Sequence, residues 1–296
     1  MPWIQIHMTV PPEEAEPVED LLMGQGAVSV TMEDAADQPL FEPDPGTTPL
    51  WNLTRVTGLF EGDADIAATQ SALAEAYHSL TQHPVEHIES EVLEDRDWER
   101  SWMDDFQPLQ FGERLWICPS WHTPPDPQAV NLMLDPGLAF GTGTHPTTAL
   151  CLGWLDQAEL TGKQVIDYGC GSGILGLAAL LLGAKHCTGV DNDPQALEAS
   201  RENARRNNVA PDRLSLFLPE QTPETPADVM IANILAQPLM DLAPHLAKLT
   251  RPGGDLVLSG ILSTQAADLT ERYEAWFDMD APEEQDGWVC LHGTRR

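Results

Sequence analysis

Apolar residues in the first part of the chain recur at the periods of short strands and helices. Ile4, Ile6, Met8 and Val10 alternate with other residues, as on a strand that buries one face. The same reasoning predicts three further strands and two helices, namely strands at 27–33, 50–60 and 85–93 and helices at 13–23 and 64–80. The last strand alternates weakly, so we expect it at a sheet edge. The order β-α-β-β-α-β predicts a ferredoxin-like α+β domain over residues 1–94.

Buried strands alternate with helices from residue 131 to the end of the chain. The apolar runs and their breakers predict strands at 165–168, 187–190, 214–218, 229–232, 256–259 and 288–293, and helices at 146–156, 177–182, 194–208, 238–249 and 264–277. Such alternation is typical of a mostly parallel, doubly wound sheet. We therefore expect residues 131–296 to form a Rossmann-like α/β domain.

The segment between the two patterns, residues 95–130, is expected to connect them. Trp98, Trp102 and Phe106 recur at intervals of four and predict one apolar face of a linker helix. Such a face more often docks on a domain than forms an aromatic cage for a substrate. A strand at 115–118 and an irregular, proline-rich stretch at 119–127 complete the predicted connector.

A glycine-rich stretch dominates the second region. Residues 165–176 read VIDYGCGSGILG, so a short strand runs into alternating glycines and then into an apolar helix. Glycines in such a turn let backbone N–H groups approach a ligand at the helix N-terminus. Asp191 ends the next predicted strand, twenty residues beyond Gly171. An acid at this place in a nucleotide-binding sheet accepts hydrogen bonds from ribose hydroxyls.

Two cofactors are compatible with this loop. The spacing Gly171-x-Gly173-x-x-Gly176 fits a dinucleotide fingerprint, but that match alone is weak. With Asp167 and Gly169 included, the stretch resembles the first motif of class I S-adenosylmethionine-dependent methyltransferases. The runs DNDP at 191–194 and RPGG at 251–254 also resemble that superfamily. We favour the methyltransferase, and an NAD-dependent oxidoreductase and a non-catalytic binding protein are the alternatives.

Longer motifs give a more specific resemblance. LDPGLAFGTGTHPTT at 134–148, DVMIANILA at 228–236, DWE at 97–99 and the opening MPWI are similar to the bacterial methyltransferases that modify large-subunit ribosomal protein eleven. This resemblance covers the whole chain. It implies methyl transfer from S-adenosylmethionine to α-amino and lysine ε-amino groups of that protein, with residues 1–94 as the substrate-recognition domain. It also implies a set of cofactor-binding residues: Thr148, Gly169, Gly171, Asp191 and Asn233.

The predicted chemistry needs a neutral amine held in line with an activated methyl carbon, and no protein nucleophile. Asn233 is the best candidate to contact that region. Related methyltransferases of planar nitrogens often carry Asn-Pro-Pro-Tyr there, whereas this chain has Asn-Ile-Leu-Ala, which suits a flexible aliphatic amine. Asp167 is expected to hold the glycine loop, and His145 to cap a helix. We predict no catalytic side chain and no metal site.

Charge and cysteine content indicate which partners and which cellular compartment to expect. The formal net charge is −32, and residues 1–92 contain 17 acids and one base, Arg55, a balance of −16. Such a surface should attract basic partners and repel nucleic acid and anionic lipid, although salt adaptation is the larger expected cause. Five scattered cysteines without a Cys-x-x-Cys pair favour reduced thiols. With no bilayer-length apolar run and no leader pattern, we expect a cytoplasmic monomer.

Overall fold

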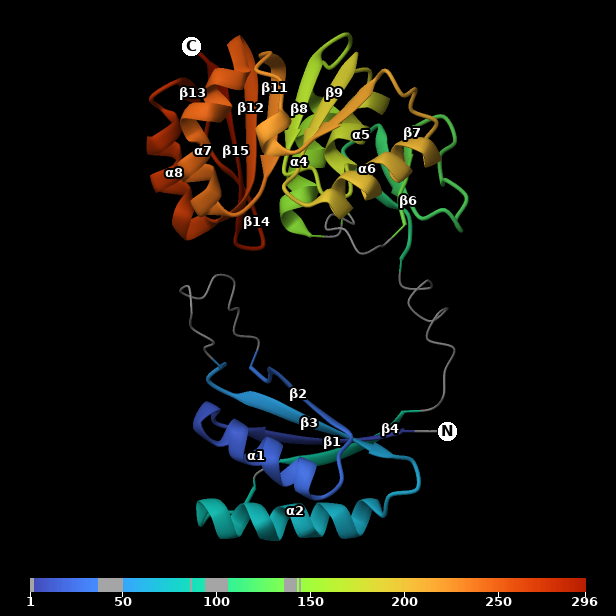
Figure 1. Ribbon diagram of the computed structural model, residues 1–296, viewed down its shortest axis with the longest axis vertical. Helices are drawn as coiled ribbons and strands as arrows, with labels where there is room; N and C mark the ends of the chain where they lie inside the picture. The colour runs from blue at the N-terminus through green and yellow to red at the C-terminus, as the bar shows by residue number, and fades with distance from the viewer. Residues whose placement is uncertain (1–2, 37–49, 86, 94–105, 136–142, 144) are drawn as a thin grey trace. The chain divides into compact units, whose positions relative to one another are not determined.

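The chain divides into two units, Met1–Asp104 and Asp105–Arg296 (Figure 1). The computed structural model describes residues 3–36, 50–85, 87–93, 106–135, 143 and 145–296. The expected boundaries at 94 and 131 differ from this division, because residues 105–130 belong to the second unit. Trp98 and Trp102 of the expected linker helix lie outside the described residues. Phe106 is described and lies in no helix or strand.

The first unit has the predicted ferredoxin-like order. Its elements are β1 (Trp3–Val10), α1 (Pro12–Gly24), β2 (Ser29–Asp34), β3 (Thr54–Glu61), α2 (Ile66–Thr81) and β4 (Ile88–Leu93). The strands form a four-stranded sheet in the order β2-β3-β1-β4, with every pair antiparallel. The predicted edge position of the last strand is therefore confirmed.

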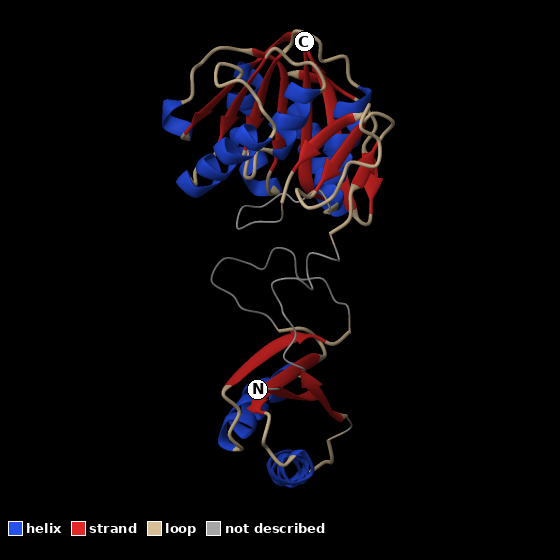
Figure 2. Cartoon of the chain, turned by 90° about the vertical axis from the view of Figure 1, so that its right-hand side faces the viewer, coloured by secondary structure: helices blue, strands red, loops and turns tan. Residues whose placement is uncertain are grey.

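One face of this sheet makes the core. The alternating apolar residues of β1 are buried and form one cluster with α1 and α2, which include Leu22, Leu73 and Tyr77. Both helices lie on the same side of the sheet (Figure 2). At Gly58 of β3 an added Cβ would lie 2.9 Å from a methyl of Leu22, so α1 packs directly against the backbone there.

The second unit contains a large sheet of eight strands in the order β10-β9-β8-β11-β12-β15-β13, with β14 beside β15. The strands are β8 (Gln164–Tyr168), β9 (His186–Val190), β10 (Leu214–Phe217), β11 (Ala227–Asn233), β12 (Thr250–Leu262), β13 (Phe277–Met279), β14 (Glu283–Gln285) and β15 (Trp288–Arg295). Strands β8 to β12 pair in parallel, and β15 runs antiparallel to its neighbours. The predicted doubly wound sheet is confirmed.

Helices cover both faces of the large sheet (Figure 2). They are α4 (Pro146–Gln157), α5 (Ile174–Leu181), α6 (Pro194–Arg206), α7 (Ala236–Leu249) and α8 (Ala266–Tyr273). Along β11, Val229 and Ile231 join the cluster under α4 and α5, whereas Met230 and Ala232 join the cluster under α7 and α8. A strand buried on both faces reads as a continuous apolar run, which explains the sequence of β11.

A small third sheet occupies part of the expected connector. It consists of β5 (Leu109–Phe111), β6 (Leu115–Cys118) and β7 (Val130–Met133), in the order β5-β6-β7. The strand predicted at 115–118 is confirmed, and the proline-rich stretch after it is irregular as expected. Asp156 of α4 holds the β5–β6 turn, because its carboxylate accepts hydrogen bonds from the N–H groups of Glu113 and Arg114 at 2.7 and 3.0 Å.

The C-terminal end departs from the expectation. The helix predicted to reach residue 277 ends at Tyr273, and Phe277 begins a strand in which its side chain is fully buried. Strands β14 and β15 form a hairpin through Asp286 and Gly287, whose φ angles are 51° and 78°. Positive φ at both positions is the type I′ turn, for which Asp-Gly is a strong sequence signal. Among the described helices, none is long and apolar enough to cross a bilayer.

Candidate functional site

The glycine loop after β8 lies at the point where the sheet changes direction, since β9 and β10 extend to one side of β8 and β11 and β12 to the other. Ligands of doubly wound sheets bind at the carboxyl ends of the strands at such a point. Gly169 and Gly173 both have a φ of 80°. An added Cβ would lie 2.2 Å from Cγ2 of Ile234 at Gly169, and 2.8 Å from Oγ of Ser200 at Gly173. Both conformation and space therefore require glycine.

Asp167 holds this loop from beneath. Its side chain is 1% exposed, and Oδ2 accepts a hydrogen bond from the N–H of Gly176 at 2.9 Å. Its other oxygen, Oδ1, is buried and has no partner among the described residues. Burial raises the pKa of Asp167 to about 7, although the Gly176 bond lowers it. The expected role of Asp167 in holding the glycine loop is confirmed.

Asp191 follows β9 directly and connects the loop after β9 to the glycine loop after β8. Its Oδ2 accepts a hydrogen bond from the N–H of Gly171 at 2.8 Å, and its Oδ1 accepts one from Asp193 at 3.0 Å. The carbonyl of Val190 accepts two more bonds, from the N–H groups of Gly169 and Cys170. A carboxylate has about four acceptor positions, so Asp191 can still accept hydrogen bonds from a ligand.

Thr148 and Asn233 meet although 85 residues separate them. The Nδ2 group of Asn233, the last residue of β11, donates to Oγ1 of Thr148 at 3.3 Å. Thr148 lies in the first turn of α4 and is 3% exposed. Ile234 follows Asn233 and lies against Gly169, so this pair adjoins the glycine loop. The structure thus brings the five predicted site residues together at one end of the sheet.

Ile234 is held from two sides. Besides its contact with Gly169, its backbone faces Gly260 of β12, which has a φ of 84°. A Cβ at Gly260 would lie 2.3 Å from the carbonyl oxygen of Ile234. The pairing of β12 with β15 shifts register at this point. The position of Asn233 therefore depends on two glycines from two different strands or loops.

His145 caps α4, as expected. It precedes Pro146, and its Nδ1 lies 2.8 Å from Oγ1 and 3.4 Å from the backbone N of Thr147. Its ring centroid lies 4.9 Å from that of Trp288, edge to face. These contacts give His145 a structural role at the start of the helix that carries Thr148.

Two residues of α6 contact the glycine loop and were not predicted. Ser200 donates its hydroxyl hydrogen to the carbonyl of Gly171 at 2.9 Å, and Asn203 donates from Nδ2 to the carbonyl of Ser172 at 2.9 Å. Both side chains are buried. Small polar residues at 200, 203 and 207 lie on one helix face, and this polar stripe is the signal in the sequence.

The five cysteines are free and buried. Burial raises the pKa of the Cys170 and Cys187 thiols, so neither is poised as a thiolate. Among the described residues, no three side chains of His, Cys, Asp or Glu gather as a metal site would require. The site therefore offers the half-buried carboxylate of Asp191 and the side-chain amide of Asn233 beside a glycine-rich turn, which suit binding and orientation of a ligand.

Comparison with known proteins identifies the family. Residues 2–296 match the family described as "Ribosomal protein L11 methyltransferase (PrmA)". The chain belongs to this family. A ribosomal protein L11 methyltransferase from Marinobacter nauticus is 65% identical over 296 residues, which are 100% of this chain and 99% of the relative. One from Pseudomonas paraeruginosa is 59% identical over 298 residues, with the same coverage.

A solved member of the family has the same fold. The crystal structure of a ribosomal protein L11 methylase from Lactobacillus delbrueckii subsp. bulgaricus gives a TM-score of 0.58 at 31% identity, over 64% of this chain and 100% of that one. Family membership confirms the S-adenosylmethionine-dependent methyltransferase predicted from the glycine loop and rejects the oxidoreductase. The glycine turn and the spare acceptor capacity of Asp191 fit this cofactor.

Proposed function

We propose that this protein transfers methyl groups from S-adenosylmethionine to α-amino and lysine ε-amino groups of ribosomal protein L11. The observation that carries the proposal is the junction of the glycine loop and Asp191 with the Asn233–Thr148 pair. Its substrate follows the names of relatives that are up to 65% identical to this chain over their whole length. When bound, the cofactor supplies an activated methyl group on a sulfonium.

The predicted cofactor residues divide the binding work. Gly169 and Gly171 let the loop backbone approach the ligand, and Asp191 accepts hydrogen bonds from the ribose hydroxyls. Thr148 lies in the first turn of α4, where the helix dipole favours the carboxylate of the methionine end. Asn233 donates to Thr148 at 3.3 Å and so belongs to the same part of the proposed site.

Asn233 also suits an amine acceptor. Because its Nδ2 donates to Thr148, the amide orientation is set and Oδ1 faces away from that bond. An amide oxygen there accepts an N–H of the incoming amine and leaves the lone pair for the methyl carbon. An α-amine with a pKa of about 7.7–8 is partly neutral near pH 7, whereas a lysine at about 10.4 must be desolvated or lose its proton to water.

The first unit is the substrate-recognition domain in this proposal. Its helices cover one sheet face, and the register of β1 with β3 and β4 places Glu61, Glu89 and Glu91 on the other. All three are exposed, as is Trp3 at 40%. An acidic face with an aromatic residue fits a basic protein such as a ribosomal protein.

Charge neutralisation on that face tests the domain's role in the full chain. The triple change Glu61→Gln, Glu89→Gln and Glu91→Gln should raise the KM for L11 roughly tenfold at low salt and leave the KM for S-adenosylmethionine unchanged. A matched triple change at exposed acids of the second unit, Glu220, Glu271 and Glu274, is the control. Equal effects of the two triples would show that only overall charge matters.

The reaction itself is tested by mass spectrometry of L11 after incubation with enzyme and S-adenosylmethionine. Asn233→Ala should abolish most methylation, whereas Glu274→Gln should not change it. Potassium chloride separates the two explanations of the acidity: recruitment weakens as the Debye length shrinks to about 3 Å at 1 M, whereas a salt-adapted enzyme keeps its activity. The five free thiols support a cytoplasmic setting.

A further inference from the structure

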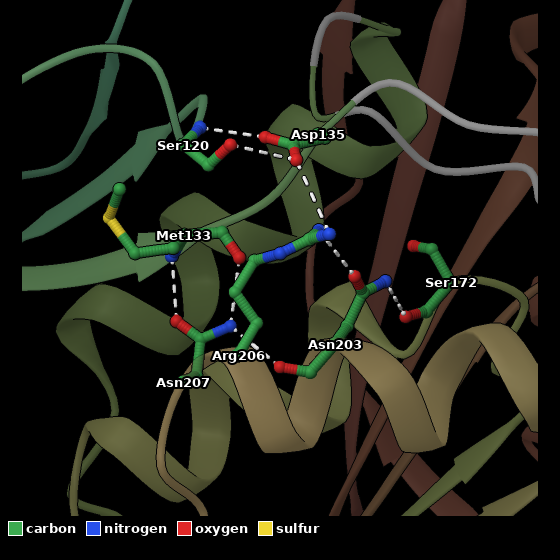
Figure 3. Close-up of polar contacts among 7 residues, drawn as sticks. All are labelled: Ser120, Met133, Asp135, Ser172, Asn203, Arg206 and Asn207. Carbon is green, nitrogen blue, oxygen red and sulfur yellow. Dashed lines mark hydrogen bonds and ion pairs between the residues drawn. The ribbon is translucent and has the colours of Figure 1, made fainter.

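A chain of polar contacts runs from the small sheet to the glycine loop (Figure 3). After β6, Ser120 donates its N–H to Oδ1 of Asp135 at 2.6 Å and its hydroxyl to Oδ2 at 2.9 Å. Oδ2 of Asp135 also lies 3.3 Å from Nη2 of Arg206 on α6. Arg206 in turn donates from Nη1 to Oδ1 of Asn203 at 3.1 Å. Asn203 reaches the carbonyl of Ser172 in the loop.

A second contact fixes α6 to the same sheet. Asn207 accepts a hydrogen bond from the N–H of Met133 in β7 at 2.7 Å and donates to its carbonyl at 2.8 Å. The side-chain amide of Asn207 therefore pairs with β7 as a neighbouring strand would. It also donates to the carbonyl of Asn203 at 2.8 Å. With α6 held in this way, Arg206 and Asn203 start from a fixed backbone.

Arg206 determines which way the Asn203 amide points. An amide has one acceptor end and one donor end, whereas a guanidinium carries only donors. The oxygen of Asn203 therefore faces Arg206, and its nitrogen faces the Ser172 carbonyl. The reversed amide would place two oxygens against each other at the loop. Because Asn203 is buried, water cannot readily replace the lost bond.

The orientation of the Ser172 carbonyl sets the glycine loop. The carbonyl and the next N–H of a planar peptide point to opposite sides. With the Ser172 oxygen held by α6, the N–H of Gly173 points back into the turn and donates to Cys170 at 2.8 Å. Ser200 holds the neighbouring Gly171 carbonyl in the same way. The loop geometry that receives the cofactor thus depends on side chains of α6.

We propose that Arg206, held by Asp135, is a positioning residue for the cofactor: it fixes the Asn203 amide and through it the peptide planes of the glycine loop. The small β5-β6-β7 sheet then contributes to cofactor binding, because Asp135 follows β7 and its partner Ser120 follows β6. This sheet lies outside the alternating pattern of strands and helices. This inference rests on the proposed cofactor site and adds residues that do not touch the ligand.

Arg206→Met tests the proposal, because it keeps the aliphatic stem and removes the donors. We expect the KM for S-adenosylmethionine to rise about tenfold, as for one lost hydrogen bond, with kcat at saturating cofactor within about twofold of the wild type. Calorimetry should show the same loss of affinity. Arg206→Lys retains a donor and a positive charge, so it should restore most of the affinity.

Arg205→Met is the matched control, since it removes the same charge one residue earlier on the same helix. The side chain of Arg205 is exposed and makes no hydrogen bond or ion pair with any described residue, and its backbone carbonyl accepts a bond from Asn208. Its replacement should leave the KM unchanged. Equal KM values for the two Met variants would overturn the proposal, and so would a failure of Arg206→Lys to restore affinity.

Two further variants locate a failure. Asp135→Asn should weaken cofactor binding less than Arg206→Met, and the double variant should be no weaker than Arg206→Met alone, because both act through one contact. Fully additive losses of affinity would show that Asp135 and Arg206 act separately and would contradict the proposed series of contacts. If Asp191→Ala leaves cofactor affinity intact, the cofactor site itself is misplaced. If Asp191→Ala weakens binding and Arg206→Met does not, only the positioning role is wrong.

Discussion

The acids at the two ends of the large sheet are held in different ways. Toward the carboxyl ends of the strands, Asp167 binds the N–H of Gly176 in the first turn of α5, and Asp191 binds the N–H groups of Gly171 and Asp193. No described lysine or arginine pairs with either acid. Toward the amino ends, Asp228 forms an ion pair with Arg251 and accepts a hydrogen bond from Gln164. Asp255 contacts Lys163 at 3.1 Å and His292 at 3.4 Å.

This difference distinguishes an acid that can bind a ligand from acids that mainly stabilise the fold. Asp191, which is held only by neutral N–H donors, keeps part of its acceptor capacity for a ligand, whereas the buried Asp167 holds the backbone. A carboxylate paired with a cation is neutralised and mainly joins strands. The chain has only three lysines, and one of them, Lys163, is used at the amino ends. Acids of one residue type therefore serve two purposes according to their partners.

The largest expected effect is on cofactor affinity. In the proposed site, Asp191→Ala would remove two charge-assisted hydrogen bonds to the ribose, each of about 1.5–3 kcal/mol, and should weaken S-adenosylmethionine binding roughly 100-fold or more. Asp255→Ala removes an acid of the other end and should leave the affinity within about twofold. Calorimetric titration of both variants measures the contrast. Similar losses in the two would show that the ends do not differ in function.

Asp167 and Asp255 should give opposite pH slopes of stability. The folded pKa of Asp167, about 7, lies above its unfolded value, so the free energy of unfolding falls as pH rises from about 4 to 7, by up to about 4 kcal/mol. Burial alone would raise the pKa of Asp255, but its bonds to His292 and Lys163 lower it. Its contribution is therefore present above the unfolded pKa and lost as pH falls through the folded one.

Urea unfolding across this pH range checks the Asp167 slope. Asp167→Asn should flatten the decline between about pH 5 and 7, because the variant has no carboxyl group to titrate there. Asp255→Asn should leave most of that decline in place, because it alters only the His292 contribution, which is lost above about pH 6.5. A wild-type curve that does not fall in this window would mean that Asp167 is ionised in the folded protein at lower pH than its burial implies.

Removal of Asp228 should reduce stability without changing cofactor binding. Asp228→Ala leaves the N–H of Gln164 without its acceptor and Arg251 without its partner. We expect a loss of about 1–3 kcal/mol in the free energy of unfolding, mainly from the partly buried N–H of Gln164. Arg251→Ala should cost less, because Arg251 is largely exposed and Gln164 keeps its bond. If Arg251→Ala costs more than Asp228→Ala, the backbone bond is the minor contribution.

The smallest effect should come from His292. Its bond to Asp255, and a second to Asp280, raise its pKa despite partial burial. Its contribution is complete below the unfolded value of about 6.5 and is lost as pH rises through the higher folded pKa. His292→Gln should thus lower the free energy of unfolding by less than about 1 kcal/mol, and only at the acid end of that window. An equal effect at pH 6 and pH 9 would exclude this linkage.

Local signals in the sequence predicted the large sheet, the ferredoxin-like unit and the glycine loop. The stretch from Asp167 to Asp191 holds the end of one strand, the glycine turn, one helix and the next strand, all within 25 residues. Burial of an alternating face likewise predicted β1. Asn233 was found from its place at the end of a strand, although its bond to Thr148 joins residues far apart in the chain.

Long-range contacts explain what was missed. Strand β5 has only three residues, too few for a periodic pattern, and its turn depends on Asp156, more than 40 residues away. Ser200 and Asn203 are ordinary residues for a helix surface until the loop lies against them. The β14–β15 hairpin is different, because its Asp-Gly pair was a local signal. The helix predicted at 264–277 was too long, because it included the short turn after Tyr273 and the start of β13, which precede that hairpin.

Gly169 and Gly260, which both contact Ile234, differ in whether a substitution there can be compensated by a second substitution. A larger residue at 169 collides with the Ile234 side chain, and a smaller residue at 234 relieves that collision; the cost of the positive φ and of a side chain beside the proposed ligand remains. At 260 the obstacle is the backbone of Ile234, which every residue shares. No second substitution at 234 compensates for a change there. A substitution at 169 can therefore be partly compensated by a second substitution at 234, whereas a substitution at 260 cannot.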